Sequence, residues 1–167
     1  MTQAYCSAVL DHPMATVWSL IHDFNNYPAY IDGISESVIE NDKRGDEVGA
    51  VRRSCYLGNW VRQRLAGHCD EEHSLTYQGI EPLPFPQGSL PESPSPTGYE
   101  GTLHLRGITE GDRALIEWAV TLDTLPRDAA QWQTLFQSWI PEWTNSLARA
   151  LARRSGGDER SSVRRSG

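Results

Sequence analysis

Apolar residues recur along the chain with two different periods, which predict two kinds of element. The spacing from Met14 to Ile21 is that of one apolar helix face and predicts a helix ending near Asp23. From residue 34 to residue 122 the period changes to two, as in half-buried strands separated by polar turns. The short connections between these strands predict an antiparallel meander. Together with a strand before the helix, the predicted strands are Ala4–Leu10, Ile34–Asn41, Val48–Leu57, Asn59–His68, Ser74–Gly79, Gly98–Gly107 and Arg113–Leu122.

The helical period returns in the last third of the chain. An apolar stripe running from Trp132 to Leu147 predicts a long helix from Asp128 to about Arg154. Pro141 lies inside this helix, and we expect it to bend or split the helix because proline lacks an N–H donor. The tryptophans of the stripe either fill the core or offer a surface on which a flat ligand stacks.

Two segments do not fit either period. Phe24, Tyr27 and Tyr30 follow the first helix among asparagine and proline residues, so residues 25–30 form a short second helix or a turn. The aromatic side chains are then available as one wall of a ligand cavity. The segment Glu81–Gly98 holds six of the ten prolines and is not a central strand. It is either a functional lid or flap, or a variable loop.

Composition and charge narrow the functional classes. The 167 residues suit one domain, which we place at residues 1–154, followed by a disordered Arg-rich tail at residues 155–167. Residues 149–167 carry a net charge of +4 within a total of −7, so the body is acidic and nucleic acid is not the expected partner. No apolar run is long enough for membrane insertion. Three cysteines without framework or metal spacing indicate reduced thiols and a cytoplasmic location.

The parity of the apolar residues assigns the inward face of each strand. The inward sets are apolar except for four residues, Arg53, Gln63, Tyr77 and Tyr99. An inward Arg53 requires water, an acidic partner or a ligand anion beside it; the alternative is a bulge or a shift of parity that turns it to solvent. Gln63 and the two tyrosines are either ligand-binding groups or satisfied polar groups of the core.

Other chemically suggestive residues are assigned to the surface. Arg52, Arg62 and Arg64 are expected on a solvated outer face, paired with acids such as Glu36 and Glu40. The run His68–His73 contains several metal-ligand types, but it crosses a hairpin and its side chains are expected to diverge into solvent. We therefore predict no metal site, and the absence of a Gly-rich phosphate loop predicts no nucleotide cofactor.

Several motifs resemble one known family. The motifs are V-W-x-x-I-x-D-F-x-x-Y-P at Val17–Pro28, G-x-x-R-R at Gly49–Arg53, Leu75-Thr76-Tyr77, Pro82-Leu83-Pro84, and Ile116-Glu117-Trp118 followed by Leu122-Asp123. They resemble the START-like (SRPBCC) superfamily in its polyketide cyclase/dehydrase branch, over about residues 4–150. The resemblance implies an α+β helix-grip fold: a seven-stranded curved antiparallel sheet wrapped around a long C-terminal helix, two short helices after strand one, and an internal hydrophobic cavity.

The resemblance also implies a type of function. Members of the superfamily include lipid carriers, hormone receptors, aromatases and cyclases. The inward arginine by which aromatase/cyclase members hold a polyketide falls at or near Gly67, so that anchor is missing and Gln63 or Arg53 would replace it. In such enzymes catalysis is mainly the folding of a flexible chain and the polarisation of carbonyls, so no strict triad is needed.

The leading hypothesis is a cofactor-independent domain that binds a polyketide-like or aromatic intermediate and promotes its cyclisation or dehydration. The rivals are a non-catalytic carrier or sensor with the same cavity, and an interaction protein whose basic tail docks on an acidic partner. The protein would be a monomer or homodimer. The expected catalytic residues are Arg53, Gln63, Tyr77 and Tyr99, and the expected ligand-contacting residues are Tyr27, Tyr30, Leu65, Leu103, Trp118, Trp139 and Trp143.

Overall fold

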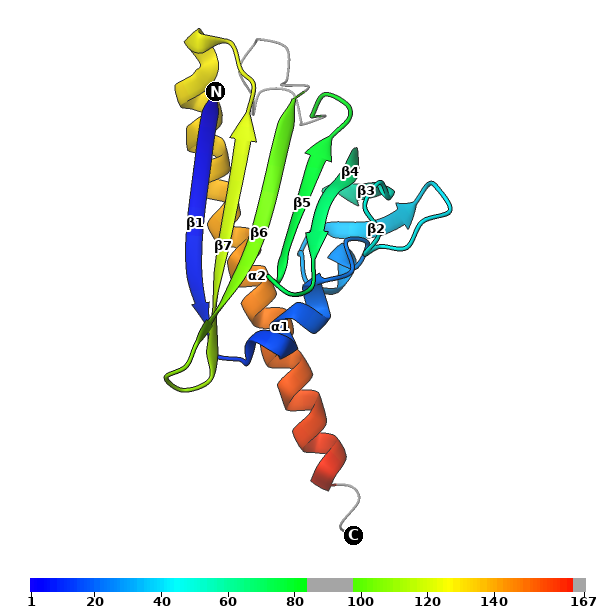
Figure 1. Cartoon of the computed structure of the whole chain (residues 1–167), viewed down its shortest axis with the longest axis vertical. Coiled ribbons are helices and arrows are strands. Elements are labelled where there is room, and N and C mark those ends of the chain that lie inside the picture. Colours follow the sequence, from blue (N-terminus) through cyan, green and yellow to red (C-terminus); the bar gives the residue numbers. More distant parts are fainter. Residues whose placement is uncertain (84–97, 164–167) are drawn as a thin grey trace.

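The computed structural model describes residues 1–83 and 98–163, and it describes side chains as far as Gly157. Seven strands form one antiparallel sheet, and a long helix packs across one face of it (Figure 1). The predicted helix-grip fold is therefore confirmed. The elements are β1 (Thr2–Leu10), α1 (Met14–Ile21), the 3-10 turn η1 (Tyr27–Ala29), β2 (Ile34–Ile39), β3 (Val51–Tyr56), β4 (Asn59–Cys69), β5 (Ser74–Gly79), β6 (Tyr99–Ile108), β7 (Arg113–Leu122), the 3-10 turn η2 (Pro126–Asp128) and α2 (Ala129–Val163).

The strand order brings the first and the last strand of the chain side by side. The order is β1-β7-β6-β5-β4-β3-β2, so β1 pairs with β7, and all the remaining neighbours are strands that are consecutive in the chain. Along β7 every second residue is buried, from Ala114 to Leu122, as its alternating pattern predicts. These side chains pack with α1 and α2 in the hydrophobic core. None of the helices in the described part of the chain combines the length and the apolar character that a bilayer span needs.

Helix α2 excludes one of the two alternatives expected for Pro141, the split, and differs from its predicted end. Pro141 lies within the helix without splitting it. The expected end near Arg154 is wrong, because the helix continues to Val163 and its last turns project beyond the sheet (Figure 1). Each added helical residue gains one backbone hydrogen bond, so a formed helix can extend without tertiary contacts. Residues 155–163 were expected in the disordered tail but are helical, and residues 164–167 lie outside the described part.

The β1 edge of the sheet is covered by side chains of α2. Gln137 accepts a hydrogen bond from the backbone N–H of Tyr5 (3.2 Å) and donates one to its carbonyl (2.6 Å). One turn earlier, Gln133 donates to the carbonyl of Gln3 (3.0 Å). These amides occupy edge groups that would otherwise be open to another strand. They also fix the helix along the edge of the sheet.

The predicted inward face of β3 is wrong by one residue. Arg52 is fully buried, whereas Arg53 is exposed and its guanidinium lies 4.2 Å from the centre of the Trp60 ring on the outer face. The pairing of β3 with β4 places Arg52 opposite Gln63. Directly paired residues share a face, and Gln63 points inward, so Arg52 must as well. The predicted inward Arg53 and outward Arg52 are both wrong.

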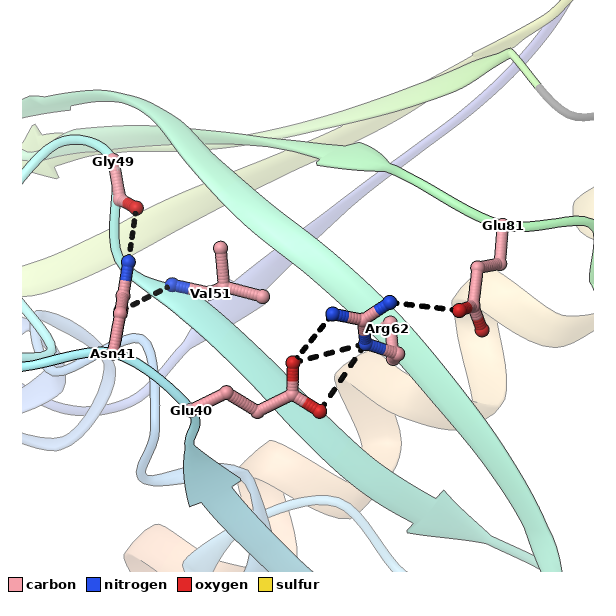
Figure 2. A network of polar contacts seen from close by, with 6 residues as sticks. All are labelled: Glu40, Asn41, Gly49, Val51, Arg62 and Glu81. Carbon is pink, nitrogen blue, oxygen red and sulfur yellow. Dashed lines mark hydrogen bonds and ion pairs between the residues drawn. The ribbon is translucent and has the colours of Figure 1, made fainter.

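The outer face carries an ion-pair network at the β2–β4 end of the sheet. Arg62 on β4 bonds Glu40 with N–O distances of 2.6 and 2.9 Å and Glu81 at 2.8 Å, which confirms the predicted pairing of Arg62 with Glu40 (Figure 2). Beside it, the Asn41 side chain bonds the Gly49 carbonyl and the Val51 N–H, each at 3.0 Å. These two hydrogen bonds join the segment that follows β2 to the start of β3.

The run His68–His73 diverges into solvent only in part, because Glu71 and Glu72 are exposed while both histidines lie against α1. Trp18 on α1 donates to Asp70 (2.9 Å), and the His68 and His73 rings lie with their centres 5.4 and 5.5 Å from the Trp18 ring. His68 also bonds the carbonyl of His22 through Nε2 (2.8 Å). The cluster ties the β4–β5 turn to α1. Within residues 1–83 and 98–157, no three side chains of metal-ligand type are grouped so as to hold an ion.

Candidate ligand cavity

A cavity of about 60 Å³ lies in the core between the β3–β7 part of the sheet and α2. It has room for a handful of water molecules, since one water needs roughly 10–15 Å³. Its walls are mostly apolar, and the polar groups gather on the sheet side. The lining residues are Tyr27, Ile31, Ile34, Ser54, Tyr56, Val61, Gln63, Tyr77, Leu83, Tyr99, Trp118, Phe136 and Trp143.

The polar end of the cavity is a row of hydrogen-bonded residues on β3, β4 and β6. Arg52 donates to the Gln63 Oε1 atom from Nε (3.1 Å) and Nη2 (2.5 Å), and from Nη1 to the Phe24 carbonyl. The Gln63 Nε2 group in turn donates to the Tyr99 hydroxyl (3.2 Å). Arginine has only donors, so Gln63 must turn its oxygen to Arg52 and its NH₂ to Tyr99. The orientation of the amide is thereby fixed.

A second tyrosine hydroxyl is fixed in the same way. The indole N–H of Trp118, which can only donate, points to the hydroxyl oxygen of Tyr77 (3.2 Å). The oxygens of Tyr77 and Tyr99 are thus both acceptors from the protein. Among the described residues, neither hydroxyl has a hydrogen-bond acceptor for its own proton. Both O–H groups are therefore available to donate to an oxygen placed in the cavity.

Two glycines create the space in which these tyrosines lie. A Cβ atom at Gly101, which pairs with Tyr77, would come within 2.1 Å of the Tyr77 ring. A Cβ atom at Gly79, which pairs with Gln63, would come within 1.9 Å of the Tyr99 ring. The repeated sequence Y-x-G on β5 and β6 thus lays each ring over the glycine of the neighbouring strand. With any larger residue at Gly79, the Tyr99 ring could not lie beside Gln63.

Burial raises the pKa of both tyrosine hydroxyls, so both stay protonated to a higher pH than an exposed tyrosine does. Desolvation raises the pKa of Tyr99 to about 12, against the opposing effects of the Gln63 hydrogen bond and the Arg52 charge. Desolvation also raises the pKa of Tyr77 well above its usual value, opposed by the hydrogen bond from Trp118 and by Arg52. The two groups are hydrogen-bond donors rather than bases across the physiological range.

The cavity is separated from an outer hollow by a pair of aromatic side chains. The Trp143 indole N–H on α2 donates to the Tyr56 hydroxyl on β3 (3.3 Å). Both side chains line the cavity, and both also line a surface hollow of about 260 Å³ that includes Asp32 and Arg149. Tyr56 and Trp143 are each half-buried, whereas most of the inner lining is buried. Movement of this pair would join the hollow to the cavity.

The structure brings most of the predicted site residues together. Gln63, Tyr77 and Tyr99 form the polar end, and Tyr27, Trp118 and Trp143 line the walls. The Trp118 and Trp143 rings lie with their centres 5.3 Å apart.

Four predicted ligand contacts lie outside the lining. Leu65 and Leu103 are buried in the core. Tyr30 is buried behind Tyr27, with ring centres 5.5 Å apart, and Trp139 packs on Phe136 at 5.1 Å. Helical and strand periodicity identifies the inward face, but not which inward residues touch empty space.

Some lining residues were missed by sequence reasoning. Val61 and Phe136 belonged to apolar patterns that had been assigned to general packing. Ser54 and Tyr56 were hidden by the wrong parity of β3. The buried Arg52 behind the cavity was missed for the same reason, although its position opposite Gln63 in a two-residue hairpin gives the correct face. The position at Gly67, where the resemblance implied an arginine, has no side chain, and the buried arginine comes from β3 instead.

Comparisons with known proteins agree with this architecture. Residues 1–154 match the family described as polyketide cyclase/dehydrase and lipid transport. No curated protein matches the chain at a significant level.

Among solved structures, the protein XoxI from Bacillus cereus is 24% identical with a TM-score of 0.75, over 91% of this chain and 96% of that one. A START superfamily protein from Mycobacterium smegmatis is 13% identical with a TM-score of 0.68, over 92% and 99%. The di-domain ARO/CYC BexL from the BE-7585A biosynthetic pathway is 11% identical with a TM-score of 0.71, over 91% of this chain and 47% of that one. At these identities the structural likeness shows a shared fold.

Proposed function

We propose that this chain, which belongs to the polyketide cyclase/dehydrase and lipid transport family, binds a hydrophobic, oxygen-bearing small molecule in the cavity and promotes its cyclisation or dehydration. The observation that carries the proposal is the pair of tyrosine O–H groups at one end of a mostly apolar space. Small-molecule sites are typically apolar cavities with a few oriented polar groups. A polyketide-like or aromatic carbonyl compound has the matching distribution of polarity.

The chemistry would follow from two effects of the cavity. Donation from Tyr77 and Tyr99 to one carbonyl oxygen draws electron density from the carbonyl carbon and acidifies the neighbouring C–H. The aromatic walls would hold the remainder of a flexible chain close to that carbon. Attack by an enol carbon then forms the ring bond. The enol becomes a ketone, and the proton that it releases passes through the ligand or water to the attacked carbonyl oxygen, which becomes a hydroxyl. Loss of this hydroxyl with a neighbouring proton, as water, completes a dehydration.

One observation favours a non-catalytic carrier or sensor as the second candidate. None of the described residues that line the cavity is a histidine, carboxylate or lysine. A general base would therefore have to come from the ligand itself or from water. At about 60 Å³ the cavity is also smaller than the roughly 300–1,000 Å³ typical of ligand pockets. A larger ligand needs the Tyr56–Trp143 pair or Leu83 to move outward.

The binding proposal is tested with a matched pair of one-ring probes, acetophenone and ethylbenzene. Trp118 and Trp143 line the cavity, so binding should change tryptophan fluorescence. Both probes should bind, and the ketone should bind several-fold more tightly because it accepts from the tyrosines. The Tyr77→Phe/Tyr99→Phe double variant should lose this preference and keep ethylbenzene binding. Failure of both probes to bind would refute the proposal.

Enzyme and carrier are distinguished once a natural ligand is in hand. Native mass spectrometry of protein purified from its own host should show a small molecule that leaves on denaturation. If the protein is an enzyme, Tyr99→Phe should lower the turnover of this molecule or its precursor by a larger factor than it lowers the affinity. If wild-type protein releases the molecule unchanged under all conditions in which it binds, the carrier function is the correct one.

A further inference from the structure

We infer that the polar end of the cavity binds a ligand oxygen that carries negative charge, the conjugated oxyanion of a phenolate or an enolate, and that Arg52 supplies the complementary charge from behind Gln63. The inference rests on the proposed function, because it specifies the charge state of the ligand in the same cavity. It also assigns Arg52 as a positioning residue, since its effect on the ligand passes through Gln63 and Tyr99.

The first argument is the uncompensated charge of Arg52. Its side chain is fully buried, and among the described residues no carboxylate forms an ion pair with it. Its N–H groups bond two neutral oxygens, those of Gln63 and of the Phe24 backbone. The centres of the Phe24 and Tyr27 rings lie 3.8 and 3.4 Å from the guanidinium carbon. These rings offset only part of the free-energy cost of burying the charge. Buried charges are normally paired, so this end of the cavity favours an anion.

The second argument is the direction of the hydrogen bonds. Arg52 forces the oxygen of Gln63 toward itself, so the Gln63 NH₂ occupies the Tyr99 oxygen and the Tyr99 proton must point elsewhere. Trp118 does the same to Tyr77. The result is two donors and a positive charge at one end of the cavity, and none of the described lining residues is a carboxylate that would oppose them. A hydrogen bond to a charged acceptor is roughly twice as strong as one between neutral groups.

The described lining of the cavity offers no negative charge that would pair with a cation instead. Its described lining contains no carboxylate, and both tyrosines stay protonated at neutral pH. The remaining walls are apolar and aromatic, including Tyr27, Phe136 and Trp143, which suits the flat body of a phenolate or a conjugated enolate. A ligand of this class has one localised acceptor end and one apolar end, as the cavity requires.

The probe for the experiment is 4-nitrophenol, whose phenolate absorbs visible light, with 4-nitroanisole as the neutral analogue that cannot ionise. Absorbance titration across pH 5–9 in the presence of saturating protein gives the pKa of the bound phenol. We expect this pKa to fall by at least one unit, which corresponds to phenolate binding at least tenfold more tightly than phenol. Benzoylacetone, titrated in the same way, tests an enolate in place of a phenolate.

The decisive variant is Gln63→Glu, which keeps the size of the side chain. A carboxylate at this position pairs with Arg52, cancels its charge and accepts the Tyr99 proton. The bound 4-nitrophenol should then regain its solution pKa, and the preference of the cavity for 4-nitrophenolate over 4-nitroanisole should be lost. Arg52→Gln should act in the same direction if it folds, but the inference does not depend on it. Arg53→Gln is the matched control, because it removes the adjacent arginine from the outer face and should leave the shift unchanged.

Each outcome separates this inference from the proposed function. If 4-nitroanisole binds but the pKa of bound 4-nitrophenol is unshifted, or is equally shifted in Gln63→Glu, the cavity binds ligands without preferring an anion and the inference is wrong. If none of the aromatic probes binds, the proposed function fails as well. A shift for benzoylacetone but not for 4-nitrophenol would restrict the site to enolates and would still support a charged oxygen.

Discussion

The two halves of the sheet share the same alternating pattern but use it differently. On the β1–β7 side, inward residues such as Ile116 and Val120 are apolar and fully buried against the helices. On the β3–β5 side, the inward positions include Arg52, Gln63 and Tyr77, and a cavity remains between them and α2. The first half shows what alternation alone can build, which is a solid core. The second half shows that a site requires polar residues whose hydrogen bonds are completed between strands, in two cases across an intervening strand.

The two halves of the sheet also differ in the role of their small residues. In the packed half, Ala114 on β7 completes an apolar layer. In the cavity half, Gly79 and Gly101 make room for tyrosine rings that lie flat over the neighbouring strand. Glycine in a strand normally costs stability because it buries no side chain. Here the tyrosine rings cover the glycines, and this packing fixes the direction of the two tyrosine hydroxyl groups.

The largest effect is expected at the glycine beneath Tyr77. Gly101→Ala would place its Cβ atom 2.1 Å from the Tyr77 ring, so the ring must leave its position. We expect a loss of roughly 3 kcal/mol in unfolding free energy, at the upper end of overpacking effects, and loss of probe binding. Urea denaturation measures the first and tryptophan fluorescence the second. In a Tyr77→Ala background the same change should cost far less, because the clash is gone.

Gly67→Ala is the matched control for that prediction. The nearest atom to its Cβ position is 3.5 Å away, in Thr76, which is an ordinary contact distance. A destabilisation of Gly67→Ala equal to that of Gly101→Ala would mean that the effect is a general property of strand glycines and that the cavity half is not specially built.

A pair of identical truncations compares the two halves directly. Val120→Ala in the packed half should cost about 2–3 kcal/mol, because the removed methyl groups leave a void in a solid core. Val61→Ala should cost only about 1 kcal/mol, because one side of Val61 already faces the cavity. Chemical denaturation of both variants checks the difference. Equal losses would show that the cavity is filled in solution and would remove the contrast between the halves.

The cavity half should also weaken at high pH. Tyr99 titrates at about 12 in the folded protein and near 10 when unfolded. Stability from its neutral form is therefore complete below pH 10 and is lost as the pH rises from about 10 through 12, since only the unfolded chain releases the proton in that range. The contribution is on the order of 2 kcal/mol. Tyr99→Phe should show a shallower fall of unfolding free energy over this range, and an unchanged slope would contradict the burial of the hydroxyl.

The smallest effect is expected on the outer face. Arg62 bonds Glu40 and Glu81 in the network of Figure 2, but all three side chains are solvent-accessible. Such pairs contribute little because water and salt screen them. Arg62→Ala should therefore change the melting temperature only slightly, and the difference should vanish in high salt. A large, salt-independent loss would show that the outer face contributes to the fold as strongly as the inner one.

The fold was predictable because it depends on repeated patterns. The strand at Arg113–Leu122 was assigned with the right bounds and the right face, since five alternate apolar residues leave only one possible parity. The site was predictable in part for the same reason, and Gln63, Tyr77 and Tyr99 were placed on the inner face. Arg53 was wrongly chosen because two adjacent arginines satisfy the same local pattern, and only the pairing with β4 decides between them.

The sequence by itself determined the period of each segment, the identity of the inward residues on strongly alternating strands and the Y-x-G repeat on β5 and β6. Those features depend on neighbours within a few positions of one another, so they can be found without a structure. The tertiary structure decided which inward residues face the cavity rather than the core, and in which direction the Gln63 amide and the tyrosine hydroxyls point. These depend on the register of separate strands and on hydrogen bonds between residues far apart in the chain, and no local pattern contains that information.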